Sequence, residues 1–555
     1  MRQLYLYLLW VLVMAGTRPV LAQTSPPPVT RHLAITGALV TPLPGQPAAK
    51  ANVIIKNGVI QGVGAGLAVP AGTQVIAADS LYLYAGFISG FSNAGVPAKE
   101  ESQGGGQGRQ RAPEGVIPGT PPDPLAGIEP QKELTSVLDP KDKNIAALRE
   151  LGFTAAVSAP RGRMLPGQAG LLLLSGETPA HMLVKPGLGL ASQLVAAQGV
   201  YPNTVIGVMA KWRDLYRQSA EALSHEKRYK SSPSGMERPA YSASVQAFYP
   251  VVEKTMPVFF RAENAKAAYR ALALQQDLGF RLMLTDLSGA QELVPEIKAK
   301  NHSVFLSLNL PEAPKDAKRP ENAMAEYDSL EARKAVARTY QWAQAAAFAR
   351  AGVPFGFSTT DLKPQNFSAS LELMKKQGLT DAQLLAALTT DAARLLGVDA
   401  LMGSVQTGKM GNLVVLDKPL GDPKAKVRMV VIEGTVYEFA AKKEGKADAG
   451  VKVAGKWSYT VESPQGANGG QMVIKGTDGN YSGTITSDRT GNTSAMDELG
   501  VDGNSVSFSY QVSNGGRSFK VSVSAKINGD SMEGTMSVGE FGSFPFTATR
   551  TGNPD

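Results

Sequence analysis

The residues LTTDAARLLG (388–397) and GKMGNLVVLD (408–417) mark the point at which this chain changes from helical to extended patterning. Residues 379–396 have the apolar spacing of a helix, whereas the LVVL within the second stretch favours a buried strand. Two further strands are expected over 427–432 and 435–439. The quoted stretch therefore separates a helix-containing region from a β region that follows it.

Helical segments alternate with short apolar runs from about residue 133 up to this stretch. Repeated βα units predict a parallel sheet whose crossovers are helices. With this many units, the leading topology is a closed (β/α)8 barrel of the TIM type. The expected strands are 153–157, 257–260, 281–284, 304–308 and 353–357, and the expected helices are 142–151, 262–278, 290–300, 330–351 and 379–396.

A second β region lies near the N-terminus. Residues 51–56 and 59–64 read as two strands, and the Asn57-Gly58 pair between them is a strong hairpin signal. Residues 85–88, AGFI, then lead into the first expected barrel strand. The helix-containing region is therefore flanked by β structure on both sides.

These stretches, in this order, resemble the amidohydrolase superfamily, especially its exported, imidazolonepropionase-like members. The resemblance covers about residues 31–440. It implies an α/β fold in which a TIM-like barrel, residues 85–397, is flanked by a composite β-sandwich made from residues 31–84 and 398–440.

The family normally binds one or two divalent metals at the C-terminal ends of the barrel strands, mainly through histidines. At the matching His-x-His positions of strand one, this chain has Phe91 and Asn93. Strand five ends in Arg261 and strand six in Asp286, neither of which is an imidazole. Asp361 stands at the position where the family carries an aspartate after strand eight. The resemblance therefore implies a degenerate metal site, and we expect no metal there.

The chain has no cysteine and only four histidines, at positions 32, 181, 225 and 302. None of the four falls where the resemblance implies a ligand, and His302 is expected at the opposite end of the barrel. Some family members use a carbamylated lysine after strand four, for which Lys185 is the nearest candidate. A conventional zinc site cannot be assembled from these residues, because zinc prefers imidazole and thiolate ligands.

Three interpretations of the barrel end remain open. In the first, Arg261 takes the place of the metal's charge and pairs with Asp286 and Asp361 in an inert site. In the second, oxygen atoms of Asn93, Glu263, Asp286 and Asp361 hold Ca²⁺, Mg²⁺ or Mn²⁺. In the third there is no metal, and the candidates are acid–base catalysis by Asp361, with Asp286 and Arg261, or a pocket lined by Phe91, Asn93 and Glu263.

Residues 441–453 are small and charged and read as a linker, and residues 454–552 read as a small antiparallel β-barrel module. The module resembles the small lipocalin-like barrels appended to exported bacterial hydrolases, at Gly455-Lys456-Trp457 and at Phe544-Pro545-Phe546. Trp457, Phe544 and Phe546 either line a ligand cavity or fill the core.

Residues 1–22 have the features of a signal peptide, with Arg2, a short apolar run and Val20-Leu21-Ala22 before the expected cleavage site. We therefore expect an exported, periplasmic protein that is not embedded in the membrane. The net charge of +8 is spread over 555 residues, so we expect no nucleic-acid partner. A small-molecule ligand and a homo-oligomer are both compatible with the sequence.

Three functions follow from these observations. The leading interpretation is an exported amidohydrolase-like protein, by descent a hydrolase of carbon–nitrogen bonds other than peptide bonds, that now binds a ligand or serves as a structural protein. The second is an active amidohydrolase with an unusual site. The third is a carbohydrate- or surface-binding protein that acts through the C-terminal β module.

Overall fold

The computed structural model describes residues 32–98, 113–312, 325–439 and 451–553, the last range with short gaps at 464–465, 478–479, 515–516 and 539–542. The chain divides into two compact units, Met1–Phe439 and Ala440–Asp555. The expected signal peptide and most of the expected linker lie outside the described residues. Among the described helices, none has the length and apolar character needed to span a membrane.

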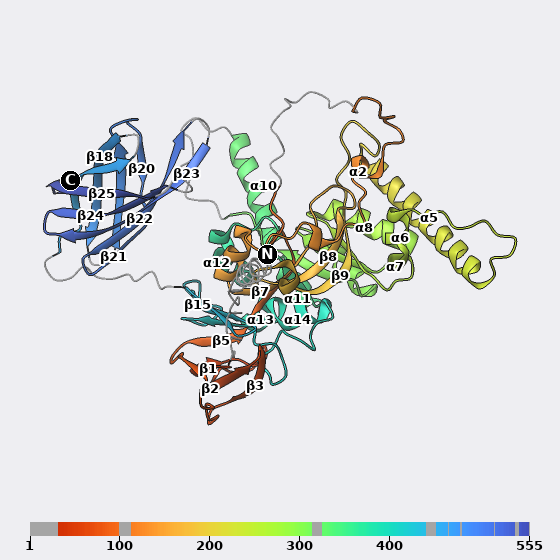
Figure 1. Cartoon of the computed structure of the whole chain (residues 1–555), viewed down its shortest axis with the longest axis horizontal. Coiled ribbons are helices and arrows are strands. Elements are labelled where there is room, and N and C mark those ends of the chain that lie inside the picture. Colours follow the sequence, from red (N-terminus) through yellow and green to blue (C-terminus); the bar gives the residue numbers. More distant parts are fainter. Residues whose placement is uncertain are drawn as a thin grey trace, which may run out of the picture. The chain divides into compact units, whose positions relative to one another are not determined.

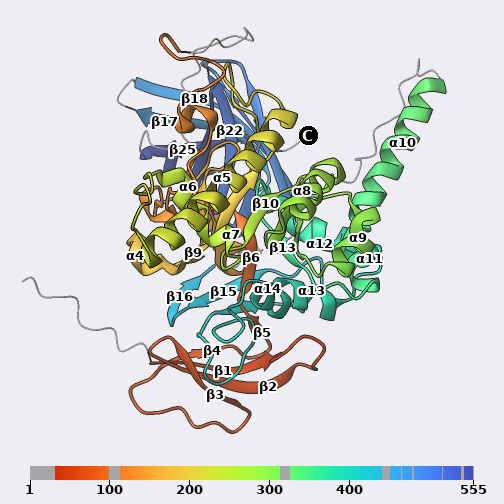
Figure 2. The ribbon, with the colours of Figure 1, turned by 90° about the vertical axis from the view of Figure 1, so that its right-hand side faces the viewer.

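The two flanking β regions pair in one eight-stranded sheet, which both ribbon views show on one side of the barrel (Figures 1 and 2). Leu413 pairs with Ala85, which joins the strand from the quoted stretch to the last strand before the barrel. Asn57 and Gly58 both have positive φ, as the expected hairpin turn requires. The strands are β1 (His32–Val40), β2 (Ala49–Lys56), β3 (Val59–Gly64), β4 (Gln74–Ala77), β5 (Tyr82–Ala85), β14 (Leu413–Leu416), β15 (Val427–Ile432) and β16 (Thr435–Glu438).

The centre of the first unit is a closed eight-stranded barrel, which confirms the expected fold class. Its strands are hydrophobic along most of their length, as is typical of a sheet that is covered on both faces. In chain order they are β6 (Phe87–Ser92), β7 (Phe153–Ser158), β8 (Gly167–Leu173), β9 (Leu183–Gln193), β10 (Val258–Arg261), β11 (Leu282–Leu287), β12 (Ser303–Ser307) and β13 (Gly356–Ser358).

Strand β8 departs from the βα repeat, because it runs antiparallel to both β7 and β9. The expectation of a parallel sheet is therefore wrong for this strand. Residues 159–166 join β7 to β8, and residues 174–182 join β8 to β9. Both connections are too short for the helical crossover that parallel strands need, which is about a dozen residues or more.

The helices surround the barrel strands (Figure 2). Two expected helices are each divided: residues 330–351 fall in α10 and α11, and residues 379–396 in α13 and α14. The basic residues at 225–230 lie at the end of α5. The helices are α2 (Asp123–Ala126), α3 (Lys143–Glu150), α4 (Pro179–Met182), α5 (Val205–Ser231), α6 (Ala243–Ala247), α7 (Tyr249–Val252), α8 (Ala265–Leu278), α9 (Val294–Ala299), α10 (Ala325–Trp342), α11 (Gln344–Arg350), α12 (Phe367–Lys376), α13 (Asp381–Leu388) and α14 (Thr390–Leu395), with short 3₁₀ turns η1 (Leu134–Ser136), η2 (Gln291–Leu293) and η3 (Pro364–Asn366).

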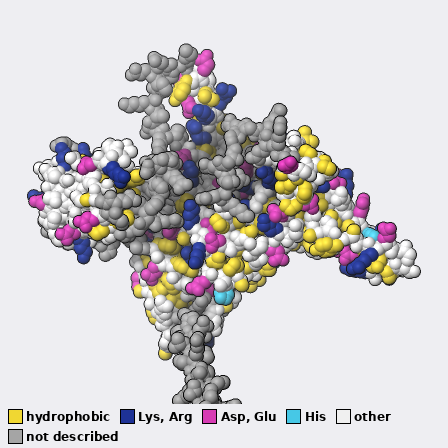
Figure 3. All heavy atoms as spheres, turned by 45° about the horizontal axis from the view of Figure 1, so that its top comes forward, with side chains coloured by type: hydrophobic (Ala, Val, Ile, Leu, Met, Phe, Trp, Pro, Cys, Tyr) yellow, Lys and Arg dark blue, Asp and Glu magenta, His cyan; other side chains and the backbone are white. Residues whose placement is uncertain are grey.

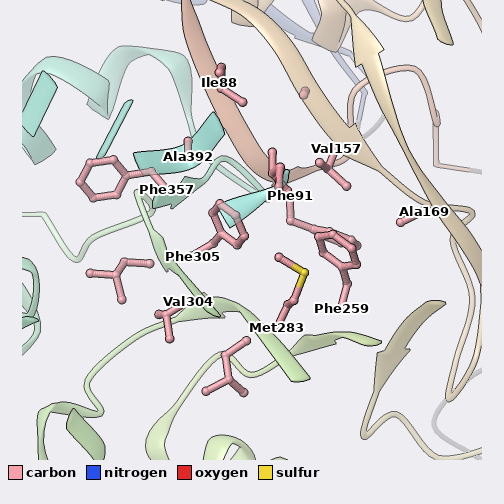
Figure 4. Packing of buried hydrophobic residues seen from close by; sticks show 14 of the residues in the cluster. Ile88, Phe91, Val157, Ala169, Phe259, Met283, Val304, Phe305, Phe357 and Ala392 are labelled. Carbon is pink, nitrogen blue, oxygen red and sulfur yellow. The ribbon is translucent and has the colours of Figure 1, made fainter. Parts of the chain in front are cut away.

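Aromatic side chains fill the barrel interior. Phe91 is stacked on Phe259 with ring centroids 6.2 Å apart, and Figure 4 shows Met283 beside them. Phe305 packs directly against the backbone of Gly90, where an added Cβ would overlap the ring. The barrel is therefore a packed core below the level of its polar end.

The second unit is the expected all-β module, and its sheet is a half-barrel of nine antiparallel strands (Figure 1). The hydrogen-bonded order begins at β20 and ends at β21. The strands are β17 (Gly455–Ser463), β18 (Gly466–Thr477), β19 (Asn480–Ser487), β20 (Thr493–Ala495), β21 (Asp497–Asp502), β22 (Ser505–Asn514), β23 (Arg517–Asn528), β24 (Ser531–Val538) and β25 (Ser543–Gly552).

Trp457 lies in the core of this module and is fully buried, as is Phe546. The indole Nε1 of Trp457 donates a hydrogen bond to Val453 O, at 3.2 Å. The guanidinium of Arg550 lies 4.3 Å from the indole centroid, and its Nη1 donates to Ala454 O at 2.6 Å. Trp457 and Phe546 therefore fill the core, whereas Phe544 is only partly buried against it.

On the face shown in Figure 3, the basic and acidic side chains of the described residues are interspersed. The expectation that the protein has no nucleic-acid partner stays a prediction, because one face does not represent the whole surface.

Candidate functional site

Four polar residues that the resemblance places at the ends of barrel strands lie together at one end of the barrel. Arg261 ends β10 and Asp286 lies near the end of β11. Asn93 directly follows β6, and Asp361 lies in the turn after β13, beyond Thr359 and Thr360. The carboxyl ends of parallel barrel strands lie at the same end of a barrel, so residues far apart in the sequence come together there. We call this end the barrel mouth.

Arg261 is the centre of the barrel mouth. Its Nη2 lies 2.6 Å from Glu263 Oε1 and 2.6 Å from Asp361 Oδ2. Its Nε lies 3.0 Å from Asp286 Oδ2. One guanidinium thus contacts three carboxylates, and we call these four residues the Arg261 cluster.

The carboxylates of the cluster differ in exposure. The side chain of Asp286 is 4% exposed, whereas those of Asp361 and Glu263 are 57% and 60% exposed. Asn93 Nδ2 donates a hydrogen bond to Asp361 Oδ1 at 3.2 Å. The outer part of the cluster is therefore solvated, and only the contact between Arg261 and Asp286 is buried.

Burial raises the pKa of Asp286 to about 7, although the positive charge of Arg261 acts in the opposite direction. Burial alone would lower the pKa of Arg261, but the charges of Asp286, Glu263 and Asp361 together raise it above its ordinary value. Arg261 therefore stays charged, while Asp286 exchanges its proton near neutral pH. A buried carboxyl with a shifted pKa is a common feature of functional sites.

Several buried polar atoms at the mouth have no hydrogen-bond partner among the described residues. The contact between Arg261 Nε and Asp286 Oδ2 is close but not aligned as a hydrogen bond, so both carboxylate oxygens of Asp286 are without a donor. The hydroxyl of Thr285 is also unpartnered. The hydroxyl of Thr360 lies near Asp286 without an aligned hydrogen bond, and its proximity lowers the pKa of that carboxyl in part. Such atoms are usually satisfied by ordered water or by a ligand, so the mouth can accept polar groups.

Asp286 and Asp361 each have φ 56, in the left-handed region that few non-glycine residues adopt. The backbone amide of Asp286 donates to Ser358 Oγ at 3.2 Å, which ties β11 to β13 at this level. The conformation turns the chain at the end of each strand. Both aspartates are therefore placed by the backbone as well as by Arg261.

A cavity of about 170 Å³ opens beside the cluster. Asp361 and Asn93 form part of its wall, with Asn144 and Arg161 as further polar residues. Sequence reasoning did not identify Asn144 or Arg161. The position of Arg161 just after β7 was the available signal, since loops that follow barrel strands lie at the mouth.

Two other predicted residues lie away from the open part of the mouth. Phe91 is 9% exposed and belongs to the packed interior, with Phe259. Lys185 lies near the start of β9, while Gln193 at the other end of that strand pairs with Arg261. A carbamate on Lys185 would therefore be several residues along β9 from the cluster.

The histidines are also distant from the mouth. His32 lies in β1, His181 in α4 and His225 in α5, and His302 precedes β12 at the opposite end of the barrel. Within the described ranges, no three residues of the types His, Cys, Asp and Glu are arranged to hold a metal ion. At the mouth itself, a cationic guanidinium stands among the carboxylates and Phe91 offers no lone pair. These residues do not fit the metal centre that the resemblance implies.

A family model and a solved structure are similar to the first unit of this chain. The model of the amidohydrolase family matches residues 270–437. An amidohydrolase from Thermotoga maritima MSB8 is 19% identical, with a TM-score of 0.57, and the match covers 73% of this chain and all of that chain. A putative prolidase from Bifidobacterium longum is 14% identical, with a TM-score of 0.45, over 74% of this chain and 95% of that chain. No curated protein matches the chain in sequence.

Proposed function

We propose, from the premise that the first unit of this chain belongs to the amidohydrolase superfamily, that Arg261 has replaced the metal centre and that the protein is a pseudoenzyme with a binding or structural role. The observation that carries this proposal is the Arg261 cluster, in which one guanidinium contacts Glu263, Asp286 and Asp361. In this proposal the Arg261 cluster stands where the family's metal centre would be, but its residues have a different chemistry.

The electrostatic argument is direct. A hydrolytic metal supplies positive charge, an open coordination position and a bound water whose pKa is near about 7. A guanidinium supplies the positive charge alone, because it has no empty orbital to accept a lone pair and stays protonated. The Arg261 cluster can therefore bind and orient polar groups, but it does not activate water in that way.

The oxygen-ligand alternative places a divalent cation among Asn93, Glu263, Asp286 and Asp361. Arg261 argues against it, since its Nη2 lies within 2.6 Å of two of these carboxylates and would repel a cation held by them. A third alternative, ligand binding by the C-terminal module, has lost part of its support, because Trp457 and Phe546 are core residues.

Export is a further part of the proposal. It is supported by the composition of residues 1–22, where a short apolar run precedes small residues at the expected cleavage position. N-terminal sequencing of the protein recovered from its native compartment tests it, and a mature start near Gln23 is the expected result.

The substitution Arg261→Gln tests the central proposal. We expect it to leave three carboxylates near one point without a counter-charge, so that Ca²⁺ or Mn²⁺ now binds and raises the melting temperature. At a cation concentration about 100 times Kd, the stabilisation is about 2.7 kcal/mol. The wild type should show no such increase.

Arg213→Gln is the matched control, because Arg213 pairs with Asp277 on the surface, away from the mouth. It should behave like the wild type. Metal analysis of the purified wild-type protein completes the test. A stoichiometric transition metal whose removal by a chelator lowers the melting temperature would contradict the proposal.

A further inference from the structure

A second cavity, of about 410 Å³, lies at the end of the barrel opposite the Arg261 cluster. It is lined where β11 and β12 begin and where α8 ends, by Arg281, Leu282, His302, Ser303 and Gly279 among others. Its volume is in the range of small-molecule sites, which is roughly 300–1,000 Å³. We call it the basal cavity.

The inner side of the basal cavity is closed by Phe280, Leu282 and Met283. All three side chains are at most 5% exposed, so they present little apolar surface to a ligand. The groups that a ligand would meet in this cavity are therefore mainly polar.

The polar wall is positively charged. Arg281 and Lys300 line the cavity, and none of its lining residues is acidic. Lys300 pairs with Glu296, but Arg281 has no ion pair or side-chain hydrogen bond with another described residue. Lys254 Nζ also lies close, 3.7 Å from where a Cβ on Gly279 would stand. Arg281 is thus a cation without a carboxylate partner among the described residues, and a bound anion would supply one.

His302 adds a polar group to the same wall. Its Nε2 is buried and has no hydrogen-bond partner among the described residues. Burial, together with the charge of Lys300, lowers the pKa of the imidazole, while the charge of Glu296 acts in the opposite direction. An unpartnered buried nitrogen beside an unpaired guanidinium is a place for a polar ligand group.

We propose that the basal cavity binds a small organic carboxylate, with its carboxylate on Arg281 beside His302. Guanidinium and carboxylate are matched in shape and form two parallel hydrogen bonds, which favours this anion for a single arginine. The site does not depend on the Arg261 cluster, which lies at the other end of the barrel.

Benzoate is a suitable probe, and benzamide is its neutral counterpart of almost the same shape. Ligand-observed NMR on the full-length protein should show saturation transfer to benzoate and an affinity at least about tenfold lower for benzamide. Arg281→Gln should lower the affinity for benzoate by about tenfold or more, since a hydrogen-bonded charge pair is lost. Arg281 is exposed, so this substitution should leave the fold intact.

Two control variants test whether benzoate binds in the basal cavity. Lys266→Gln removes an exposed cation at the start of α8, outside the basal cavity, and should bind benzoate like the wild type. Arg261→Gln should also retain binding, which separates this cavity from the barrel mouth. In crystals soaked with 4-bromobenzoate, the anomalous bromine peak should lie within the basal cavity.

The proposal is overturned if benzoate does not bind, if benzamide binds as well as benzoate, or if Arg281→Gln binds as tightly as the wild type. A bromine peak outside the basal cavity would have the same consequence.

Discussion

Asp286 and Asp361 contact the same guanidinium with the same backbone conformation, yet their energetics differ because their burial differs. An ion pair between exposed groups contributes about 0–1 kcal/mol, which applies to Asp361. A buried charge must be compensated, and Asp286 is only partly compensated, since neither of its oxygens accepts an aligned hydrogen bond from the described residues. Asp286 is therefore the member of the Arg261 cluster whose charge state matters most for the energetics of the site.

The first prediction concerns the dependence of stability on pH. The folded pKa of Asp286 is about 7, above its ordinary value of 3.8, so between these values the folded state binds more protons than the unfolded state. Stability from this group is therefore fully present below about pH 4, is lost as the pH rises towards 7, and then levels off. The difference is on the order of 4 kcal/mol.

Chemical denaturation of the wild type and Asp286→Asn between pH 4 and pH 8 measures this effect. Asn tolerates the left-handed conformation of position 286, so the change is mainly one of charge. The variant should gain stability relative to the wild type as the pH rises. Parallel curves for the two proteins would show that Asp286 does not titrate in this range. Asp361→Asn, which removes an exposed carboxylate from the same arginine, is the control for loss of an ion pair.

At the scale of elements, the barrel mouth depends on how strands end and helices begin. Helix α8 starts shortly after Arg261, and the side chain of Asn264 caps it by accepting a hydrogen bond from Ala267 N at 3.0 Å. Gly279 ends the same helix in the left-handed conformation and forms part of the basal cavity. One helix thus connects the two candidate sites, with its start near one and its end at the other.

The second prediction tests this cap. Asn264→Ala should lower the free energy of unfolding of the first unit by about 1 kcal/mol, because a helix N–H loses its acceptor. Asn264→Asp keeps an acceptor at the cap and should cost much less. Urea denaturation followed by circular dichroism measures both variants. Equal losses in the two would mean that the side-chain cap does not contribute.

At the scale of the whole molecule, the two units have separate hydrophobic cores. The core of the second unit contains Trp457, Tyr459 and Phe546, while the barrel core is built around residues such as Phe259 and Phe305. Cores that share no residues can unfold separately, so a single two-state transition is not expected for the full chain.

The third prediction follows from this division. Arg550→Ala should lower the melting temperature of the second unit, because Trp457 loses its cation–π contact and the carbonyls of Lys452 and Ala454 lose their donors. The cost is on the order of 2 kcal/mol. The transition of the barrel unit should not move. Differential scanning calorimetry resolves the two transitions, and a shift of both by the same amount would contradict independent cores.

Much of this protein follows from local sequence. The hairpin signal at Asn57-Gly58, the alternation of helical and apolar segments, and the return to strands after residue 403 predict the sheet and the barrel, because element type depends on side-chain periodicity and turn residues. Under the resemblance to the amidohydrolase superfamily, the identities of Phe91 and Arg261 likewise predict that imidazole ligands are missing from these positions.

Other features were decided only by the tertiary structure. Contacts between residues far apart in the chain decide the antiparallel direction of β8 and the burial of Asp286 beside an exposed Asp361. They also decide the distance of Lys185 from the mouth and the position of the unpaired Arg281 in the basal cavity. Desolvation and Coulomb interactions act through space, so the pKa of Asp286 and the charge of a cavity wall appear only when the barrel closes.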